Sequence, residues 1–432
     1  MTAFERLARR EFFGIKLGLD NVRVLTAALD HPERACPTVI IAGTNGKGSV
    51  AAFTSRALHA AGHRVGLYTS PHLVDLTERY RIAEESVSAG SLAQALDLVL
   101  DTDEALTRDG LLPGPATYFE VATVAAFVLF QNAGLDVAVL EVGMGGRFDA
   151  TNVAQAPFAA ITSIALDHTA HLGDTLSAIA FEKAGVIAPG AHVVSGVRQP
   201  EAADVVRREA QARQATLIDV VDDTSSTVEL RGSRTWVTLE TSRRRYGPLP
   251  LALNGRHQAD NAAVAVRLLE TLDAQLMPVP ARAIEAGLRD AWWPARLQVV
   301  ERQGRPPLVI DGAHNPAGAH ALALWLQEAG LAPCTLVLAL MRDKDLEAML
   351  PAVLGVAGAV VATTVHPPRG LEAEPLAAAV RRLAPALPVQ VADTPAEALR
   401  RADRSDAPVV VAGSLFLAGA VLAHLRETPE AP

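Results

Sequence analysis

The sequence is poor in cysteine and has neither a long basic tract nor a long apolar run, and each absence excludes a class of protein. Its 432 residues include only two cysteines, Cys36 and Cys334, which are too few for a disulfide framework and lack metal-ligand spacing. The formal net charge is −9, and the scattered basic residues argue against a nucleic-acid surface. The short arginine run at 243–245 is more typical of a solvated hairpin end than of a binding patch.

Signals for secretion and membrane insertion are also missing. No apolar run reaches the roughly 18 residues needed to span a bilayer, and residues 1–6 lack a basic-then-apolar signal pattern. The low cysteine content fits a reducing compartment. We therefore expect a cytoplasmic protein without a membrane partner. We also expect a monomer, because no predicted helix offers an unambiguous dimer seam.

Length and patterning predict an α/β protein of two domains. The chain exceeds one ordinary core, and half of its residues are apolar, so it can bury two. From residue 39 to about 196, strand-like runs alternate with helical ones, which favours a mostly parallel sheet covered on both faces. The predicted strands are 39–42, 65–68, 137–140, 158–164 and 192–195, with predicted helices at 50–61, 91–100 and 120–130.

The pattern then changes twice. Residues 228–230, 235–239 and 249–253 read as antiparallel strands, with a turn at 231–233, and a helix follows at 260–272. Trp292-Trp293-Pro294 interrupts the pattern, so we place the domain boundary there and predict domains at 1–293 and 294–432. The second domain is predicted to be a smaller α/β unit with strands at 308–310, 335–338, 359–362, 389–391 and 409–411 and helices such as 317–328 and 377–383.

A glycine-rich loop lies between the first predicted strand and the helix after it, and reads Gly43-Thr44-Asn45-Gly46-Lys47-Gly48-Ser49. Glycines let backbone N–H groups turn towards one point, the helix presents its positive end there, and the lysine adds a mobile cation. This combination predicts a nucleotide phosphate site. The spacing differs from the common G-x-x-x-x-G-K-[ST] loop, because a glycine separates the lysine from the serine.

Polar residues follow several predicted strands, where the carboxyl ends of a parallel sheet form a ligand crevice. Ser70 follows one such strand, Glu141 ends another, and Asp167-His168 follows a third. The carboxylate of Glu141 suits Mg²⁺. A capping or salt-bridged glutamate is the alternative, and the metal role is convincing only if Glu141 lies beside the loop. Taken alone, His168 is more typical of a surface histidine, and Lys183 of an exposed helix lysine.

These segments together resemble folylpolyglutamate synthase and dihydrofolate synthase, the folate branch of the Mur ligase superfamily. The resemblance runs over nearly the whole chain, from Gly14 through the glycine-rich loop to Gly413-Ser414-Leu415. It is carried by Ser70-Pro71-His72-Leu73, Thr117-Tyr118-Phe119-Glu120, Leu140-Glu141-Val142-Gly143, Gly145-Gly146-Arg147-Phe148-Asp149-Ala150-Thr151-Asn152, Asp167-His168-Thr169, Glu182-Lys183-Ala184-Gly185, Trp293-Pro294-Ala295-Arg296-Leu297-Gln298 and Asp311-Gly312-Ala313-His314-Asn315-Pro316.

The resemblance implies an N-terminal Mur-ligase-type ATP-binding domain and a Rossmann-like C-terminal domain, with ATP between them. It assigns the phosphates to the loop, the adenine side to Asn261, the γ-phosphate to Arg296 and the ribose side to Asp311 and His314. The implied ATP-binding loop residues are Asn45, Gly46, Lys47, Gly48 and Ser49. A nucleotide held from both domains implies that the domains close on substrate.

The resemblance also implies two Mg²⁺ sites and a modified lysine. The positions of Ser70 and Glu141 match ligands of one Mg²⁺, and His168 matches a ligand of the second. Lys183 matches a carbamylated lysine, a modification that replaces a cation by a carboxylate-like anion beside the metals. Lys47, Lys183, Arg296 and His168 are therefore the expected catalytic set.

For the acceptor, the resemblance implies a pterin-binding site. Phe119, Asp149 and Ala150 match pterin-binding positions of bifunctional bacterial members, and the neighbouring candidates are Thr117, Tyr118, Glu120 and Phe148. A packed aromatic would explain Phe119 alone, and a loop-capping carboxylate would explain Asp149 alone. Two small departures from the family pattern are Met144 in place of leucine and Ala295 in place of glycine, where the extra methyl lies next to Arg296.

The implied activity is ATP-dependent ligation of L-glutamate to dihydropteroate and to reduced folates through an acyl phosphate. Three alternatives stay open at the level of the sequence. The chain could be a folylpolyglutamate synthase only, or a peptidoglycan-type ligase, although the 38 residues before the first strand are short for the extra domain of the latter. It could also be a P-loop switch that hydrolyses nucleotide without an acceptor.

Overall fold

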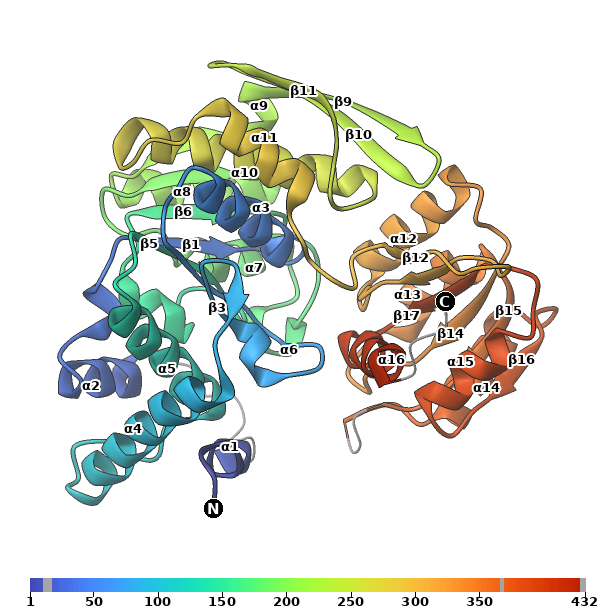
Figure 1. Cartoon of the computed structure of the whole chain (residues 1–432), viewed down its shortest axis with the longest axis horizontal. Coiled ribbons are helices and arrows are strands. Elements are labelled where there is room, and N and C mark those ends of the chain that lie inside the picture. Colours follow the sequence, from blue (N-terminus) through green and yellow to red (C-terminus); the bar gives the residue numbers. More distant parts are fainter. Residues whose placement is uncertain (11–17, 366–368, 428–432) are drawn as a thin grey trace.

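Two α/β units make up the protein (Figure 1). The computed structural model describes residues 1–10, 18–365 and 369–427. The predicted class, a large parallel-rich sheet followed by a smaller C-terminal α/β domain, is confirmed. The boundary at 293/294 stays a prediction, and Gly14 to Leu17 of the resemblance lie outside the described residues. Within the described ranges, no helix combines the length and apolarity needed to cross a bilayer.

The larger sheet has the strand order β4-β3-β2-β5-β1-β6-β7-β8. From β2 to β8 in this order neighbouring strands are parallel, whereas β3 and β4 form an antiparallel edge. The bounds are β1 Thr38–Ala42, β2 Val65–Tyr68, β3 Tyr80–Ile82, β4 Glu85–Ser86, β5 Val137–Glu141, β6 Phe158–Ile161, β7 His192–Ser195 and β8 Thr216–Asp219. The carboxyl ends of β1, β2, β5 and β6 therefore lie side by side, as the sequence predicts.

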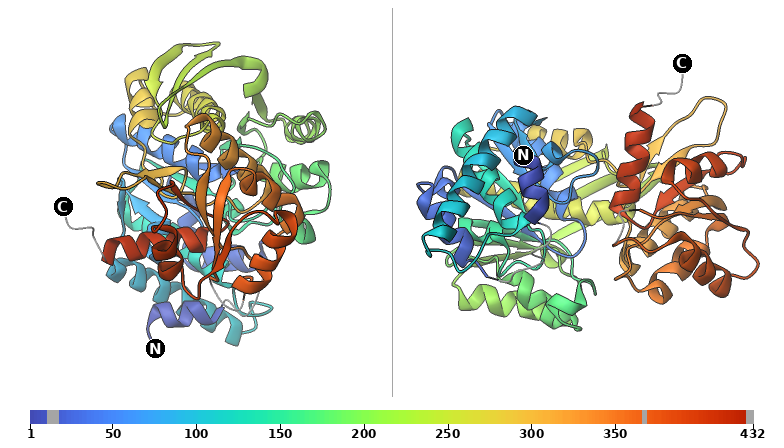
Figure 2. Two further views of the ribbon diagram at one scale, coloured as in Figure 1. Left: turned by 90° about the vertical axis from the view of Figure 1, so that its right-hand side faces the viewer. Right: turned by 90° about the horizontal axis from the view of Figure 1, so that it is seen from below.

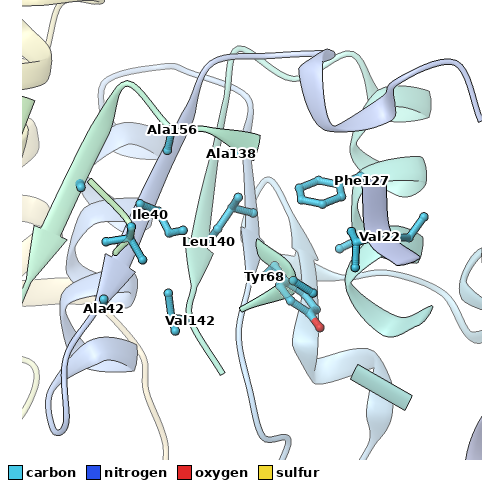
Figure 3. Packing of buried hydrophobic residues seen from close by; sticks show 14 of the residues in the cluster. Val22, Ile40, Ala42, Tyr68, Phe127, Ala138, Leu140, Val142 and Ala156 are labelled. Atoms are coloured by element: carbon cyan, nitrogen blue, oxygen red, sulfur yellow. The ribbon is translucent and has the colours of Figure 1, made fainter. Parts of the chain in front are cut away.

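Helices cover both faces of this sheet because its central strands are apolar on both sides. In β1, Ile40 packs into one core cluster, while Val39 and Ile41 pack into the other, since strand side chains alternate. The first cluster receives α1 Ala3–Ala8, α2 Asp20–Ala28, α4 Ala89–Arg108, α5 Tyr118–Ala133, α7 Leu176–Ala184 and α8 Pro200–Ala212. Figure 3 shows part of this cluster, including Val22 of α2, Phe127 of α5 and Ile40 of β1. The second receives α3 Lys47–Ala60, α10 Arg256–Gln275 and α11 Ala281–Asp290.

Short helices connect these elements: α6 Thr169–Leu172, α9 Val220–Asp223, and the 3-10 turns η2 Pro32–Arg34, η3 Leu76–Arg79 and η4 Ala150–Ala154. The predicted strand 158–164 is too long, because β6 ends at Ile161 and the next residues turn to support the glycine-rich loop. The remaining predicted strands and helices of this part are present, and the helices extend further than predicted, whereas the strand ends are shifted by one residue at most.

A three-stranded antiparallel sheet, β11-β10-β9, follows the large one. Its strands are β9 Thr224–Arg231, β10 Arg234–Thr241 and β11 Arg245–Pro250, and the arginine run lies at the β10–β11 turn as predicted. The predicted strand 249–253 is wrong beyond Pro250. There the buried Leu251 and Leu253 leave the sheet and pack under α10 and α11 instead.

The C-terminal sheet has the order β12-β13-β17-β14-β15-β16, parallel except for the β12–β13 pair. Its strands are β12 Gln298–Val300, β13 Leu308–Ile310, β14 Cys334–Leu338, β15 Ala357–Ala362, β16 Val389–Val391 and β17 Val409–Ala412. One face is covered by α12 Pro316–Glu328, α13 Leu346–Leu354 and α14 Ala373–Leu383, and the other by α15 Pro395–Ala402 and α16 Leu415–Glu427.

The two domains lie side by side, with α16 on the side of the C-terminal domain that faces the N-terminal one (Figures 1 and 2). Side chains of the N-terminal domain reach the other domain at both ends of this boundary. Leu230 packs against one C-terminal core cluster and Leu73 against the other. Arg256 of α10 donates to Glu328 of α12 at 2.6 Å.

The packing of Phe127 provides a test of the N-terminal core. This ring is 2% exposed between α5 and the sheet (Figure 3). We expect Phe127→Ala to lower the free energy of unfolding by about 3–5 kcal/mol, because a cavity remains where the ring was. Leu98→Ala, at a residue 47% exposed on α4, is the control. Urea titrations measure both, and equal losses in the two variants would contradict this packing.

Candidate nucleotide site

The glycine-rich loop joins β1 to α3 in a conformation that its glycines permit. Gly43 has φ +146° and Gly46 has φ +86°, values that residues with a Cβ rarely adopt. A Cβ at Gly46 would lie 2.2 Å from Oδ1 of Asn261, and one at Gly48 would lie 2.7 Å from the Trp293 ring. The first N–H groups of α3 have no intrahelical partner, so this end of the helix can bind an anion.

The segment after β6 holds this loop in place. Thr162 Oγ1 donates to Asn45 O at 2.6 Å, and Thr44 N donates to Ser163 O at 2.7 Å. Asn45 N donates to Ser163 Oγ at 3.2 Å. The loop is therefore shaped before any ligand arrives, which reduces the entropy lost on binding.

A cavity of about 410 Å³ opens at this loop and is lined by both domains. It brings together all of the predicted nucleotide and metal residues. Those that line it are Asn45, Gly46, Lys47, Gly48, Ser49, Ser70, Glu141, His168, Lys183, Asn261, Arg296, Asp311 and His314. The approach of Lys47, Arg296 and Asp311 to a single cavity is the geometry that a nucleotide held from both domains requires.

Three oxygen-bearing side chains that line this cavity, those of Ser49, Ser70 and Glu141, fit a hard cation. Glu141 is 5% exposed, its Oε2 accepts from Ser70 N at 3.2 Å, and burial raises its pKa. Ser49 Oγ is buried without a hydrogen-bond partner among the described residues. A divalent cation would favour the charged form of Glu141 and would give Ser49 Oγ a partner.

The described residues contain no cluster of three His, Cys, Asp or Glu side chains that could hold a metal by themselves. A metal here would therefore also need hydroxyl, water or phosphate ligands, which is the usual situation of Mg²⁺ at a nucleotide. His168 lines the same cavity from the loop before α6, and its backbone has φ +50°. Desolvation lowers the pKa of its ring, so the neutral form that can bind a metal predominates at neutral pH.

Lys183 is a buried lysine with an unusual charge state. It lies on α7, is 4% exposed, and donates from Nζ to Gly43 O at 2.8 Å. Burial, and after it the charge of Lys47, lowers its pKa to about 7. A large share of the Lys183 amines is therefore neutral at neutral pH, unlike those of ordinary lysines.

A polar bridge across the cavity joins the two domains, and sequence reasoning missed most of it. Lys344 Nζ donates to Asp167 Oδ1 at 2.8 Å, and Asn315 Nδ2 donates to Asp167 Oδ2 at 3.1 Å and to Asn45 Oδ1 at 2.9 Å. Burial alone would raise the pKa of Asp167, but His168, Lys344 and His314 hold it below its ordinary value. Asn315 also caps α12 through Gly318 N.

Lysine scarcity is the signal that could have identified Lys344. Only four of the 39 basic residues are lysines, at positions 16, 47, 183 and 344. Lys16 lies outside the described residues, and the other three line this one cavity. Lysine has a compact charge and a pKa that its surroundings can shift, and arginine has neither property. The lysines in this cavity therefore indicate that these properties are needed there.

Asp311 and Arg296 meet at the link between the domains. Asp311 is 7% exposed, and its two oxygens accept from Leu297 N and Ala313 N, each at 2.8 Å. Arg296 NH1 donates to Ala295 O at 2.9 Å. Ala295 has φ +57°, so this position favours glycine and the sequence departure there carries backbone strain.

Asn261, the predicted adenine contact, is fixed by a neighbour that the sequence interpretation did not include. Gln258 is 1% exposed, and its Oε1 accepts from Asn261 Nδ2 at 2.9 Å. His314 Nδ1 donates to Gly312 O at 2.7 Å, and burial lowers the pKa of this ring to about 4. His314 is therefore neutral, with Nε2 left as an acceptor.

The predicted pterin residues line neither this cavity nor the second one described below. Thr117 and Glu120 form a reciprocal capping box at the start of α5. Asp149 accepts from Gly143 N, Met144 N, Thr151 N and Thr151 Oγ1, which are the contacts of a loop-capping carboxylate. Tyr118 lies under Arg79, Phe119 packs against Tyr68 and over Gly143, Phe148 stacks on Arg147, and Ala150 is buried at the start of η4.

A second cavity of about 220 Å³ adjoins the first and shares with it Ser70, Pro71, Glu141, Arg296 and Leu415. Its other walls include Leu73, Arg81, Trp292 and Trp293. Trp292 is 59% exposed, which is unusual for a tryptophan. The two cavities therefore meet at Ser70, Glu141 and Arg296.

Comparisons with known proteins agree with this geometry. The family model of the Mur ligase middle domain matches residues 41–269, and that of the dihydrofolate synthetase C-terminal domain matches residues 296–424. The dihydrofolate synthase/folylpolyglutamate synthase of Bacillus subtilis is 34% identical over 84% of this chain and 85% of its own length. Two archaeal relatives, from Haloferax volcanii and Halobacterium salinarum, are 37% identical, and the chain spans about half (49%) of the length of each.

Solved structures are similar over the whole chain. Mycobacterium tuberculosis folylpolyglutamate synthase complexed with ADP and AMPPCP has a TM-score of 0.89 at 32% identity and covers 100% of both chains. E. coli FolC in complex with DHPP and ADP has a TM-score of 0.87 at 30% identity, covering 99% of this chain and 98% of that one. In these two relatives the same fold binds adenine nucleotides.

The cavity also contains a histidine whose titration should affect stability. Burial, and then Arg296, lowers the pKa of His257 from 6.5 to about 4. Between these pH values the unfolded state binds the proton and the folded state does not, so stability rises with pH across this window. We expect the free energy of unfolding to fall by about 1–3 kcal/mol more in the wild type than in His257→Gln between pH 7 and pH 4.

Urea titrations at a series of pH values measure this difference. His320→Gln, at an exposed position on α12, controls for the loss of a histidine as such. A difference between wild type and His257→Gln that stays constant from pH 7 to pH 4 would contradict the burial of a neutral ring.

Proposed function

The chain belongs to the dihydrofolate synthase/folylpolyglutamate synthase family of Mur-type ligases, and from this premise we propose that it joins L-glutamate to folate-type acids with ATP. Both dihydropteroate and reduced folates are proposed acceptors, giving dihydrofolate and folylpolyglutamates. The observation that supports this most is the cavity lined by Lys47 and Ser49 from one domain and by Arg296 and Asp311 from the other. ATP bound there has its phosphates at the loop, its adenine beside α10 and its ribose against the C-terminal domain.

The proposed reaction has two steps. A carboxylate oxygen of the acceptor attacks the γ-phosphorus in line, the bond to the β-γ bridging oxygen breaks, and ADP leaves with an acyl phosphate formed. The glutamate amine then attacks the acyl carbon and loses a proton, and inorganic phosphate leaves as the amide forms. Both steps are favoured by positioning and by charge stabilisation rather than by covalent catalysis by the protein.

Each proposed ATP contact has a structural basis. Loop N–H groups and Lys47 bind the phosphates, and Arg296 reaches the γ-phosphate from the linker. Asn261, oriented by Gln258, lies on the adenine side, and Asp311 and His314 lie on the ribose side. The bridge from Asp167 to Lys344 and Asn315 keeps the domains together and excludes water from the acyl phosphate.

We propose that Mg²⁺ is held by Ser70 and Glu141 at one site and by His168 and modified Lys183 at the second. When bound, it would neutralise charge on the transferred phosphoryl group. Ser49 Oγ is buried without a partner among the described residues, so we propose Ser49 as an additional Mg²⁺ ligand. The sequence interpretation assigned Ser49 only to the phosphates.

Carbamylation of Lys183 fits its environment. The neutral amine adds to CO₂, forming an N–C bond and releasing one proton, and only the unprotonated amine can do this. A pKa of about 7 makes that form abundant at neutral pH. The carbamate anion would also offset the positive charge of Lys47 and of the metals, whereas an ammonium would repel them.

For the acceptor we propose the pterin site of the resemblance, formed by Phe119, Asp149 and Ala150 with Thr117, Tyr118, Glu120 and Phe148. Asp149 shapes the 143–150 loop in this proposal, because its oxygens already accept four hydrogen bonds. We further propose a cytoplasmic monomer with domains at 1–293 and 294–432, as expected from the sequence. Folylpolyglutamate synthesis alone is the second candidate, since the pterin residues line neither described cavity.

The function is tested by following ADP release with each substrate omitted in turn. We expect ADP and phosphate only with an acceptor acid present, and sustained turnover only when L-glutamate is added. Mass spectrometry should find the acceptor heavier by one glutamyl residue. Dihydropteroate and tetrahydrofolate in separate reactions distinguish the bifunctional enzyme from the tail-extending one. Equal ADP release without any acceptor would instead support a P-loop switch.

Lys183→Ala tests the carbamate. We expect turnover to fall almost to background while folding is retained, and bicarbonate not to restore it, because the variant has no amine to modify. NMR after addition of ¹³C-bicarbonate should show a carbamate signal in the wild type only. Full activity of Lys183→Ala would remove the proposed role, and Lys183→Arg, which keeps a charge but cannot be carbamylated in this way, should be as inactive.

Glu141 tests the first Mg²⁺ site. We expect Glu141→Ala and the isosteric Glu141→Gln to weaken Mg²⁺-dependent nucleotide binding by at least roughly tenfold, because each removes the charged oxygen ligand. Isothermal titration calorimetry with ATP, with and without Mg²⁺, measures this. A magnesium dependence equal to that of the wild type would contradict the assignment.

A further inference from the structure

The loop after β2 connects the reaction site to the C-terminal domain. It starts at Ser70, which donates to Glu141 and lines both cavities. Glu78 fixes the middle of the loop, because its Oε2 accepts from Leu73 N at 2.8 Å and from Val74 N at 3.2 Å. We refer to residues 70–78 as the Ser70 loop.

The Ser70 loop is seated on helix α16 of the other domain. The side chain of Leu73 packs against the core cluster beneath α15 and α16. Glu78 Oε1 lies 3.8 Å from Arg426 NH1 near the end of α16. The loop therefore contacts both the middle and the end of this helix, although it belongs to the N-terminal domain.

Gly419 is the residue that permits this contact. It lies inside α16, and a Cβ built on it would lie 2.0 Å from the carbonyl oxygen of Leu73 and 2.8 Å from its carbonyl carbon. Both are backbone atoms, so a side chain could not be accommodated by rotation of a flexible group. A glycine inside a helix is otherwise unfavourable, which indicates that the close approach has a use.

We propose that Gly419 is a positioning residue: it lets α16 seat against the Ser70 loop, so that closure of the C-terminal domain fixes Ser70 and Pro71 beside Glu141. The expected effect on turnover rests on the proposed function, whereas the contact between Gly419 and the Ser70 loop is independent of it. Neither Gly419 nor its helix neighbours Ala418 and Ala420 line either cavity. The residue acts through the loop and not by touching substrate.

Gly419→Ala gives a direct test, because a purely structural role and a positioning role predict different results. If the contact had no function, alanine would raise helix propensity and leave turnover unchanged. We expect instead that backbone amides of residues 72–78 exchange with deuterium faster. We also expect kcat to fall by at least about tenfold, as a misplaced reacting group costs this much. The melting temperature of Gly419→Ala should be no lower than that of a second variant, Leu73→Ala.

Two further variants complete the test. Gly90→Ala makes the same change in the first turn of α4, where the nearest atom to a new Cβ is 3.8 Å away, and it should alter neither exchange at 72–78 nor kcat. Leu73→Ala removes the apolar anchor without adding bulk, and it should also speed exchange at residues 74–78. This second variant is read by exchange alone, since Leu73 lines a cavity.

The outcomes separate this inference from the proposed function. Faster exchange in Gly419→Ala and Leu73→Ala, together with the lowered kcat of Gly419→Ala, supports the inference. Unchanged exchange in Gly419→Ala overturns it, whatever happens to turnover, and so does faster exchange with unchanged kcat. Exchange needs no substrate, so failure to find ligase activity in the wild type would refute the proposed function and leave the loop contact measurable.

Discussion

The hydrogen bonds that cross the nucleotide cavity are the constraint on which the site depends. Asn45 in the glycine-rich loop and Asp167 after β6 belong to the N-terminal domain, and both accept from Asn315 at the start of α12. Lys344 adds a buried ion pair to Asp167. These contacts help to keep the loop with Lys47 and the C-terminal residues Arg296 and Asp311 at one cavity, so that both domains can contact a single nucleotide.

Burial of charge is the second general feature of this cavity. The pKa values of Glu141 and Asp311 are raised, and those of Lys183, His257 and His314 are lowered, with burial as the first cause in each case. Such groups are unfavourable in an empty cavity, and a bound metal and triphosphate would compensate them. The use of three of the four lysines of the chain here is consistent with that cost, because these positions require properties that arginine lacks.

The sequence predicted the fold and the glycine-rich loop from local patterns, whereas most of the other candidate site residues came from the family resemblance. The apolar runs of β1 and β5 and the glycine spacing of the loop specify strand, turn and helix independently of the rest of the chain. It did not predict Lys344, because its partner Asp167 is distant in the sequence. It also did not predict Gln258, which contacts Asn261 one helical turn away. The predicted strands 158–164 and 249–253 ran past the observed ends of β6 and β11. Apolar residues such as Ile164 and Leu251 are buried outside the sheet, and composition alone does not distinguish them from strand residues.

The central claim is that the cavity directs the γ-phosphoryl group of ATP to a carboxylate. It is tested most directly with an acceptor acid labelled with ¹⁸O in both carboxyl oxygens, incubated with ATP and L-glutamate. One of these oxygens bridges carbon and phosphorus in the acyl phosphate and leaves with phosphorus when the amine attacks. Mass analysis should therefore find one ¹⁸O in the released phosphate and one in the amide product. Unlabelled phosphate formed together with amide would contradict this account.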